Sequence, residues 1–246
     1  MADVLFFRAN FELATEYLYF WFGLGIESAE KLGYRVIDIG GEAATLDNLL
    51  DALEKYNFNA IFLGGHGNET TLTGQNYQQI LKACVNDQVM SGNLAYLLSC
   101  YTGLELGPSM ISKKTQAYVG YNRDFRFMIN SDLSIQEDSM TSLAQPFQEI
   151  VLEIITRILK GQSMGEVYNG GVLKCNEWIE KLFERREYKW GQVIEFLKHN
   201  RDALIALGKR EVHATPPMPT SAPGSFIPFA ASVGGGALLL ALGMLM

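Results

Sequence analysis

A histidine and a cysteine each follow a short apolar run, and both have glycine nearby. His66 comes near the end of the run AIFLGGHG at residues 60–67, and Cys100 ends the run LAYLLSC at residues 94–100. A cysteine thiolate is a strong nucleophile, and a neighbouring imidazole can generate or stabilise it at neutral pH. The pair therefore indicates nucleophilic catalysis, provided that the fold brings the two side chains to one place.

Each of these residues has a plainer explanation when it is taken alone. A cysteine after a buried strand is usually a small core residue, and a histidine beside glycine is usually a loop residue. Their equivalent positions after two successive strands favour a shared site. The remaining candidates are weaker: Cys84 and Cys175 lie in helical patterns and are assigned to packing, and His199 and His213 have no evident partner.

The backbone around this pair suits acyl transfer. Gly65 and Gly67 flank His66 and allow the chain to approach a substrate carbonyl closely. The N–H groups of Gly67 and Cys100 are predicted to point at a developing oxyanion. No aspartate or asparagine is clearly placed to orient His66, so the prediction is a dyad of His66 and Cys100.

Five apolar runs alternate with helical patterns, which predicts an α/β fold with a mainly parallel sheet flanked by helices. Functional residues of such sheets lie just past the carboxyl ends of the strands. The continuous apolarity of the runs before His66 and Cys100 indicates strands buried on both faces. Strands are expected at residues 3–7, 34–40, 59–64, 94–98 and 116–121, and helices at 12–32, 47–56, 76–85 and 105–114.

From Thr141 onward the pattern is helical, with segments at residues 142–161, 163–183 and 191–208. These helices are expected to cover an edge of the sheet or to form a small helical appendage. We therefore assign residues 1–210 to one domain, whose helical part begins at about residue 141.

The composition limits the classes of function. The 246 residues are 48% hydrophobic and 19% charged, as in ordinary globular proteins, and the net charge is −7. Nucleic-acid binding is not expected, because phosphate neutralisation needs clustered lysine and arginine. The three cysteines are widely spaced and lack a CxxC motif, which predicts a reducing compartment and no zinc site. The N-terminus has no secretion-signal pattern, so a cytoplasmic, non-secreted domain is expected.

The C-terminal residues differ from the rest. Residues 211–225 form a proline-rich linker, and residues 226–246 form an uncharged apolar tail. Its length suffices for a helix across a hydrocarbon core of about 30 Å, and small residues recur at four-residue spacing, as in closely packed membrane helices. Pro228 and Gly234 to Gly236 weaken such a helix. The hypotheses are a membrane-inserted tail, or a segment that packs on the domain or on a sister chain in a homo-oligomer.

The two motifs resemble those of the caspase-like cysteine peptidases, a group that includes caspases, metacaspases, separases, gingipains, clostripain and the CHAT peptidases. The matching stretches are IFLGGHG at residues 61–67 and LLSCYTG at residues 97–103. QAYVGYNRDF at residues 116–125 is similar to the strand after the nucleophile in bacterial members. The pattern is nearest to the CHAT and gingipain-like branches and departs from the Gln-Ala-Cys signature of caspases.

The resemblance implies an endopeptidase that cleaves protein or peptide substrates through an acyl-enzyme, and no cofactor or metal is expected. It makes Cys100 the nucleophile, His66 the general base or imidazolium partner, and Gly67 with Cys100 the oxyanion hole. It also implies that charged loop residues select the P1 side chain, which precedes the scissile bond. Arg8 would favour an acidic P1 residue and Asp124 a basic one, unless they are solvated or pair with each other.

A second hypothesis comes from another class of function. The caspase-like domain would then be catalytically inactive, and the chain would act as an assembly or membrane-effector module through its glycine-rich tail. A nucleotide-binding α/β domain is disfavoured, because GGHGNETTLTG at residues 64–74 has neither the Walker lysine nor the dinucleotide spacing of glycines.

Overall fold

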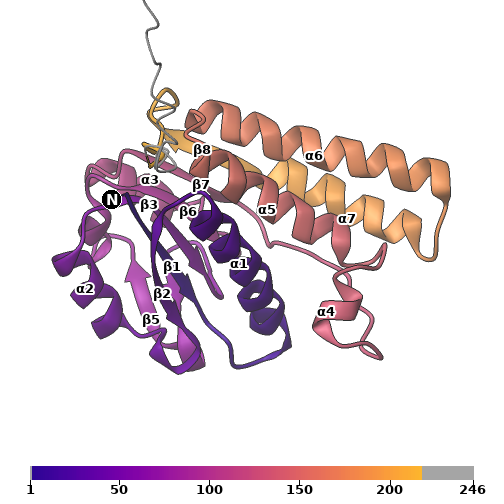
Figure 1. Ribbon diagram of the computed structural model, residues 1–246, viewed down its shortest axis with the longest axis horizontal. Helices are drawn as coiled ribbons and strands as arrows, with labels where there is room; N and C mark the ends of the chain where they lie inside the picture. The colour runs from indigo at the N-terminus through magenta and orange to yellow at the C-terminus, as the bar shows by residue number, and fades with distance from the viewer. Residues whose placement is uncertain (1, 218–246) are drawn as a thin grey trace, which may run out of the picture.

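The computed structural model describes residues 2–217, and its centre is a six-stranded sheet (Figure 1). The strand order is β2-β1-β3-β6-β7-β8. Every pair from β2 to β7 is parallel, and β8 runs antiparallel to β7. The strands are β1 (Asp3–Arg8), β2 (Arg35–Gly40), β3 (Phe58–Gly64), β6 (Leu94–Leu98), β7 (Ala117–Tyr121) and β8 (Leu204–Gly208).

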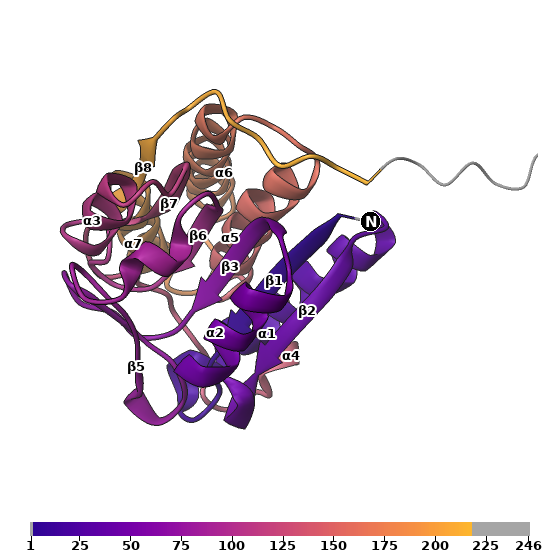
Figure 2. The ribbon, with the colours of Figure 1, turned by 90° about the vertical axis from the view of Figure 1, so that its left-hand side faces the viewer.

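Helices cover both faces of the sheet. One face carries α1 (Leu13–Lys31), α5 (Gln145–Leu159), α6 (Met164–Arg185) and α7 (Trp190–Ala203). The other face, toward the viewer in Figure 2, carries α2 (Leu46–Lys55), α3 (Leu106–Ser112) and a hairpin of β4 (Thr71–Thr73) and β5 (Gln79–Lys82). A single turn, α4 (Ile135–Asp138), lies beside α1. The sequence thus correctly predicts a mainly parallel sheet flanked by helices.

The alternation of side chains along β1 explains the two cores. Val4 and Phe6 pack under the helices α1 and α5, whereas Leu5 and Phe7 pack on the opposite face, and all four are fully buried. A parallel strand between two helical layers has no solvent-facing side, so both of its faces must be apolar. The same holds for β3 and β6, whose burial confirms the expectation from their continuous apolarity.

The helix predicted at residues 76–85 is wrong. Asn76 and Tyr77 have left-handed φ angles of 51° and 62°, which no helix accommodates, and the chain then forms β5. Ile80 and Leu81 are consecutive apolar residues, and both are buried in the core that contains Leu5 and Phe7. Cys84, assigned to helix packing, instead lies exposed in the following turn with φ of 62°.

The helical segment predicted at residues 191–208 also ends early. α7 stops at Ala203, and Leu204–Gly208 form β8 along the free edge of β7. Without β8, the outer N–H and C=O groups of β7 would have no hydrogen-bond partners in the sheet. β8 supplies those partners by pairing with β7. Cys175 is buried in α6, as predicted.

Residues 226–246, for which a membrane-inserted tail is the hypothesis, lie outside the described residues, as do residues 218–225 of the linker. A search of the helices within residues 2–217 finds none with the length and apolarity that a bilayer crossing requires.

Candidate active site

The pairing of β3 with β6 places His66 and Cys100 at equivalent points of the sheet edge. Gly64 is the register partner of Leu98, and each candidate residue follows two positions later. The N–H of Gly65 donates to the carbonyl of Leu98 at 3.3 Å, which extends the pairing into the loops. Neighbouring strands lie about 4.8 Å apart, so the two loops begin side by side at the carboxyl edge of the sheet.

Gly67 brings the two loops into direct contact. A Cβ atom at this position would lie 2.6 Å from the carbonyl oxygen of Cys100, 2.8 Å from Thr102 Cγ2 and 3.0 Å from Ser99 Cβ. Real Cβ atoms essentially never approach so closely, so a residue with a side chain would push the loops apart. Glycine is therefore the residue type that lets the histidine loop lie against the cysteine loop.

Two backbone donors in this contact region have no acceptor. Among residues 2–217, neither the N–H of Gly67 nor that of Cys100 donates a hydrogen bond to backbone or side chain. By contrast, the next N–H along the chain is paired, because Asn68 N–H donates to the carbonyl of Thr71. Backbone N–H groups without a partner on two touching loops can receive an oxyanion.

His66 is held by a carboxylate that sequence reasoning missed. Its Nε2 lies 2.9 Å from Glu12 Oε1, and both side chains are about one-third exposed. Glu12 is the N-cap of α1, where the same Oε1 atom accepts from the N–H of Thr15 at 3.1 Å. The two residues are 54 positions apart, and only the adjacency of β1 and β3 brings them together.

This contact favours one tautomer of the imidazole. An ionised carboxylate only accepts hydrogen bonds, so Nε2 of a neutral His66 is the donor and Nδ1 keeps its lone pair. The ring stacks on Tyr77 with centroids 5.3 Å apart and meets the edge of Phe11 at 6.0 Å. Among the described residues no hydrogen bond joins His66 to Cys100.

Cys100 is partly buried, and its sulfur accepts from the N–H of Phe125 at 3.4 Å. Burial raises the pKa of this thiol, the Phe125 N–H partly offsets that rise, and the nearby Asp124 carboxylate adds to it. The resting thiol is therefore protonated at neutral pH. A base must remove its proton before the sulfur can attack a substrate.

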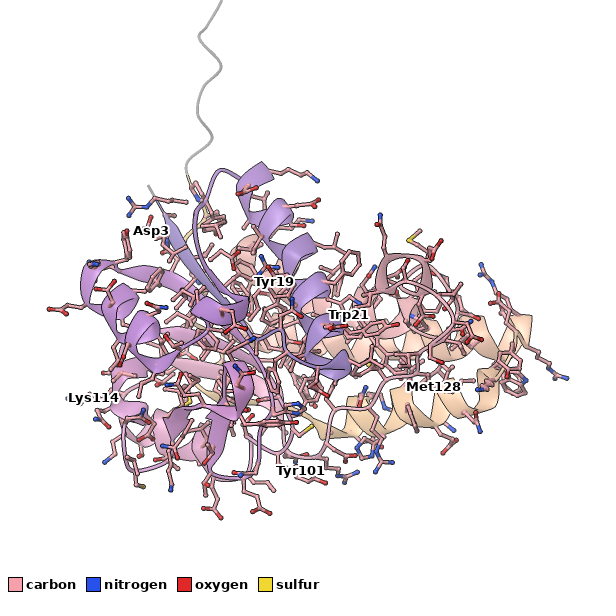
Figure 3. The ribbon with its side chains drawn as sticks, turned by 90° about the horizontal axis from the view of Figure 1, so that it is seen from below. Asp3, Tyr19, Trp21, Tyr101, Lys114 and Met128 are labelled. Carbon is pink, nitrogen blue, oxygen red and sulfur yellow. The ribbon has the colours of Figure 1, made fainter. Side chains whose placement is uncertain are left out.

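The residue after Cys100 has a left-handed backbone. Tyr101 has φ of 61°, a conformation that is costly for a residue with a side chain. Its N–H donates to the carbonyl of Arg123 at 3.0 Å, and the N–H of Gly103 donates to the carbonyl of Tyr121 at 2.8 Å. These two bonds tie the cysteine loop to the chain after β7, and Figure 3 shows Tyr101 on this edge of the molecule.

Asp124 lies beside the thiol within a cluster of charges. Its carboxylate accepts from Arg126 Nε at 2.6 Å and lies 3.0 Å from His199 Nε2. Tyr101 OH is at 3.5 Å from the same carboxylate. His199 thus has a partner, contrary to the expectation that it has none.

Arg8 lies at the end of β1, on the face covered by α1. Its guanidinium donates twice to the carboxylate of Asp38, at 2.9 and 2.6 Å, and once to the carbonyl of Tyr19 at 3.0 Å. The pairing of Arg8 with Asp124 that the sequence allowed is not formed, because each has a nearer partner of its own.

A search among residues 2–217 finds no group of three or more His, Cys, Asp or Glu side chains arranged to hold a metal ion. The site consists of a thiol, an imidazole with a carboxylate partner, and free backbone donors. This set is suited to acyl transfer through a covalent thioester.

Comparisons with known proteins support the fold. No protein-family profile and no curated protein sequence matches this chain. A solved structure that matches is the complex of Porphyromonas gingivalis RgpB pro- and mature domains, with a TM-score of 0.54 and 14% sequence identity. The match covers 87% of this chain and 48% of that one, so the chain spans about half the length of the solved relative. At this identity the likeness concerns the fold alone, and it agrees with the resemblance stated for the motifs. The chain has a caspase-like α/β fold.

Proposed function

We propose that this protein is a cysteine endopeptidase that cleaves protein or peptide substrates. The observation that supports this most strongly is the pair of partnerless N–H groups at Gly67 and Cys100, on loops that touch beside a thiol and an imidazole. Both residues are partly buried, so in a purely structural arrangement these two donors would have to be paired with water.

The reaction begins when Nδ1 of His66 takes the proton of the Cys100 thiol. The sulfur attacks the carbonyl carbon of the scissile peptide, and the oxygen takes up negative charge between the N–H groups of Gly67 and Cys100. The C–N bond then breaks, and the imidazolium returns its proton to the departing amine. Water attacks the thioester with His66 again acting as base, which releases the acid product and restores the thiol.

Glu12 is a positioning residue in this mechanism. It holds the Nε2–H of His66 and stabilises the imidazolium that forms when the thiol is deprotonated. Because Glu12 also caps α1, the first turn of a 19-residue helix anchors the orientation of the base. A third group that orients the base completes the arrangement expected of an activated nucleophile.

We propose that Asp124 contributes a preference for a basic P1 residue. Asp124 lies close enough to the thiol for its charge to raise the pKa of Cys100, and the next residue, Phe125, donates to the sulfur. Both candidates are already paired, Arg8 with Asp38 and Asp124 with Arg126, so the choice of Asp124 rests on the effect of its charge on the thiol. A substrate cation would compete with Arg126 for the Asp124 carboxylate.

The test is covalent labelling of the full chain with acyloxymethyl-ketone peptides that carry Arg, Lys, Asp or Leu at P1. Mass spectrometry then identifies the modified residue. We expect labelling at Cys100, fastest with the basic peptides and absent in Cys100→Ala. Cys84→Ala is the matched control, because Cys84 is exposed and should leave labelling unchanged. Labelling that persists in Cys100→Ala and vanishes in Cys84→Ala would overturn the assignment.

A further inference from the structure

A groove of about 410 Å³ runs along the outer side of α1 next to the end of β1. Its apolar lining includes Phe20 and Leu24 from α1 and Ile135 from α4, and these side chains are partly buried. The aromatic ring of Tyr19 lines it as well, on the helix where Figure 3 labels Tyr19 and Trp21. Partly exposed apolar side chains in a concave surface are typical of a binding site.

The stretch of α1 that lines the groove has a carboxylate at each end. Glu16 and Glu27 both line it and are separated by eleven positions of α1. At 1.5 Å per residue, this separation corresponds to about 16 Å along the helix axis. The apolar side chains of Phe20 and Leu24 lie between them.

The groove is negative overall, because its one cation is neutralised. Arg8 lines it, but the guanidinium is bound by both oxygens of Asp38 and lies over the Tyr19 ring at 3.8 Å. Among the described residues Glu16 has no ion pair. Glu27 meets Lys31 at 3.7 Å, and with both side chains mostly exposed this contact is weak.

The groove starts beside the proposed catalytic residues. Glu16 follows Glu12 by one helical turn, and Glu12 contacts His66. Asn10, also part of the lining, is fixed by two reciprocal backbone hydrogen bonds with the Gln75 amide at 2.8 and 2.9 Å. A peptide chain that passes His66 therefore meets the Glu16 end first.

We propose that this groove binds an extended peptide segment with two basic side chains five positions apart and apolar side chains between them. Extended chain rises about 3.3 Å per residue, so five positions span about 16 Å and match the separation of Glu16 and Glu27. Charge complementarity selects the basic residues, and Phe20 and Leu24 receive the apolar ones. That the segment belongs to a substrate rests on the proposed peptidase function, whereas its binding does not.

Binding is measured with the full-length Cys100→Ala protein, which cannot turn the peptide over. The probe is the fluorescein-labelled peptide Arg-Ala-Leu-Phe-Ala-Arg, followed by fluorescence anisotropy at low and high salt. We expect the double variant Glu16→Gln/Glu27→Gln to bind about tenfold more weakly, which corresponds to about 1.4 kcal/mol. Salt should weaken binding to the parent protein more than to this variant.

Matched controls separate the groove from general surface charge. Glu30→Gln/Glu54→Gln removes the same two charges at exposed positions outside the lining and should bind as the parent does. A second peptide, with glutamine in place of both arginines, should bind at least tenfold more weakly. Equal affinity of the two double variants, or of the two peptides, would overturn the proposal.

A kinetic measurement tests the substrate role separately. In the protein with Cys100 intact, a longer peptide that carries the basic segment should show a higher KM in Glu16→Gln/Glu27→Gln at unchanged kcat. Retained anisotropy without any cleavage or labelling at Cys100 would refute the peptidase function and leave the binding site standing. Cleavage with a KM unaffected by the double variant would refute the groove as a substrate site.

Discussion

Replacement of Gly67 by alanine is the most direct test of the contact between the two candidate catalytic loops. The φ angle of Gly67 is not in the left-handed region, so alanine is acceptable to the backbone and its effect is steric. The added Cβ would lie 2.6 Å from the Cys100 carbonyl oxygen, whereas ordinary contact begins at 3.4 Å. The cysteine loop must therefore move by about 0.8 Å, and the N–H of Cys100 moves with it.

Two magnitudes follow from this displacement. Overpacking of this kind costs about 1–3 kcal/mol of unfolding free energy, which for a chain of this size lowers Tm by roughly 2–12 °C. A misplacement near 1 Å between reacting groups lowers a catalytic rate by about 100-fold. The rate of Cys100 labelling by a peptidyl acyloxymethyl ketone should consequently fall far more than the stability loss alone explains, since most of the protein remains folded.

The assay combines scanning calorimetry with labelling rates from mass spectrometry. Gly191→Ala is the control, because a Cβ at Gly191 has no atom within 4 Å and the residue lies in the first turn of α7. It should keep the labelling rate and leave Tm unchanged or higher. A Gly67→Ala protein that melts and labels like the parent would show that the loops do not depend on this contact, and the proposed oxyanion site would lose its basis.

Three further predictions concern the groups around the thiol. Glu12→Ala removes both the His66 partner and the α1 cap. We expect it to lower the free energy of unfolding by about 0.5–2 kcal/mol and to slow Cys100 labelling at least about tenfold. The control Ser163→Ala removes the equivalent cap of α6 and should leave the labelling rate unchanged. Asp124→Asn removes a negative charge that raises the pKa of Cys100, so the pH profile of its reaction with iodoacetamide should shift to lower pH, and a shift to higher pH would contradict the assigned electrostatics. Burial raises the pKa of Cys175 to about 12, so native protein at pH 8 should show no alkylation there until it is unfolded, as peptide mapping would reveal.

The sequence predicts the sheet because its strands obey one simple rule. A strand between two helical layers is apolar on both sides, and the runs at residues 59–64 and 94–98 are continuous in this way. The strand–helix alternation then implies parallel order, which places His66 and Cys100 on the same edge. The β3–β6 pairing confirms this part of the inference, whereas the catalytic roles of the two residues stay predictions.

The missed elements are those whose conformation depends on distant residues. Residues 79–82 carry the consecutive apolar pair Ile80 and Leu81, which fits a helix as well as a strand, and the left-handed residues before them decide the outcome. The sequence of residues 204–208 continues the apolar pattern of α7 without any break in composition. These residues form a strand because they pair with the free edge of β7. Local periodicity contains neither piece of information.

Glu12 shows why only part of a site can be predicted from a sequence. Its spacing from Thr15 marks the start of a helix, and both residues serve that purpose, because the Glu12 carboxylate and the Thr15 hydroxyl exchange hydrogen bonds with each other's backbone. The same carboxylate oxygen reaches His66 only because β1 lies next to β3, with Arg8 in register with Gly64. Its second role is a property of the sheet order, which a pattern along the chain does not specify.

In the proposed function, this double role makes α1 the element that relates base and substrate. The positive end of the helix dipole favours the Glu12 carboxylate at the cap, so that the group which orients His66 is stabilised by the helix it begins. Further along, Glu16 and Glu27 point into the groove from the same helix. Because α1 packs against α5 where Gly25 meets Ile155, and against the sheet where the buried ring of Phe22 meets Phe6, it cannot shift without disturbing the core. A peptide held along α1 is therefore held at a fixed distance from the imidazole, which is the positioning that a cleavage reaction requires.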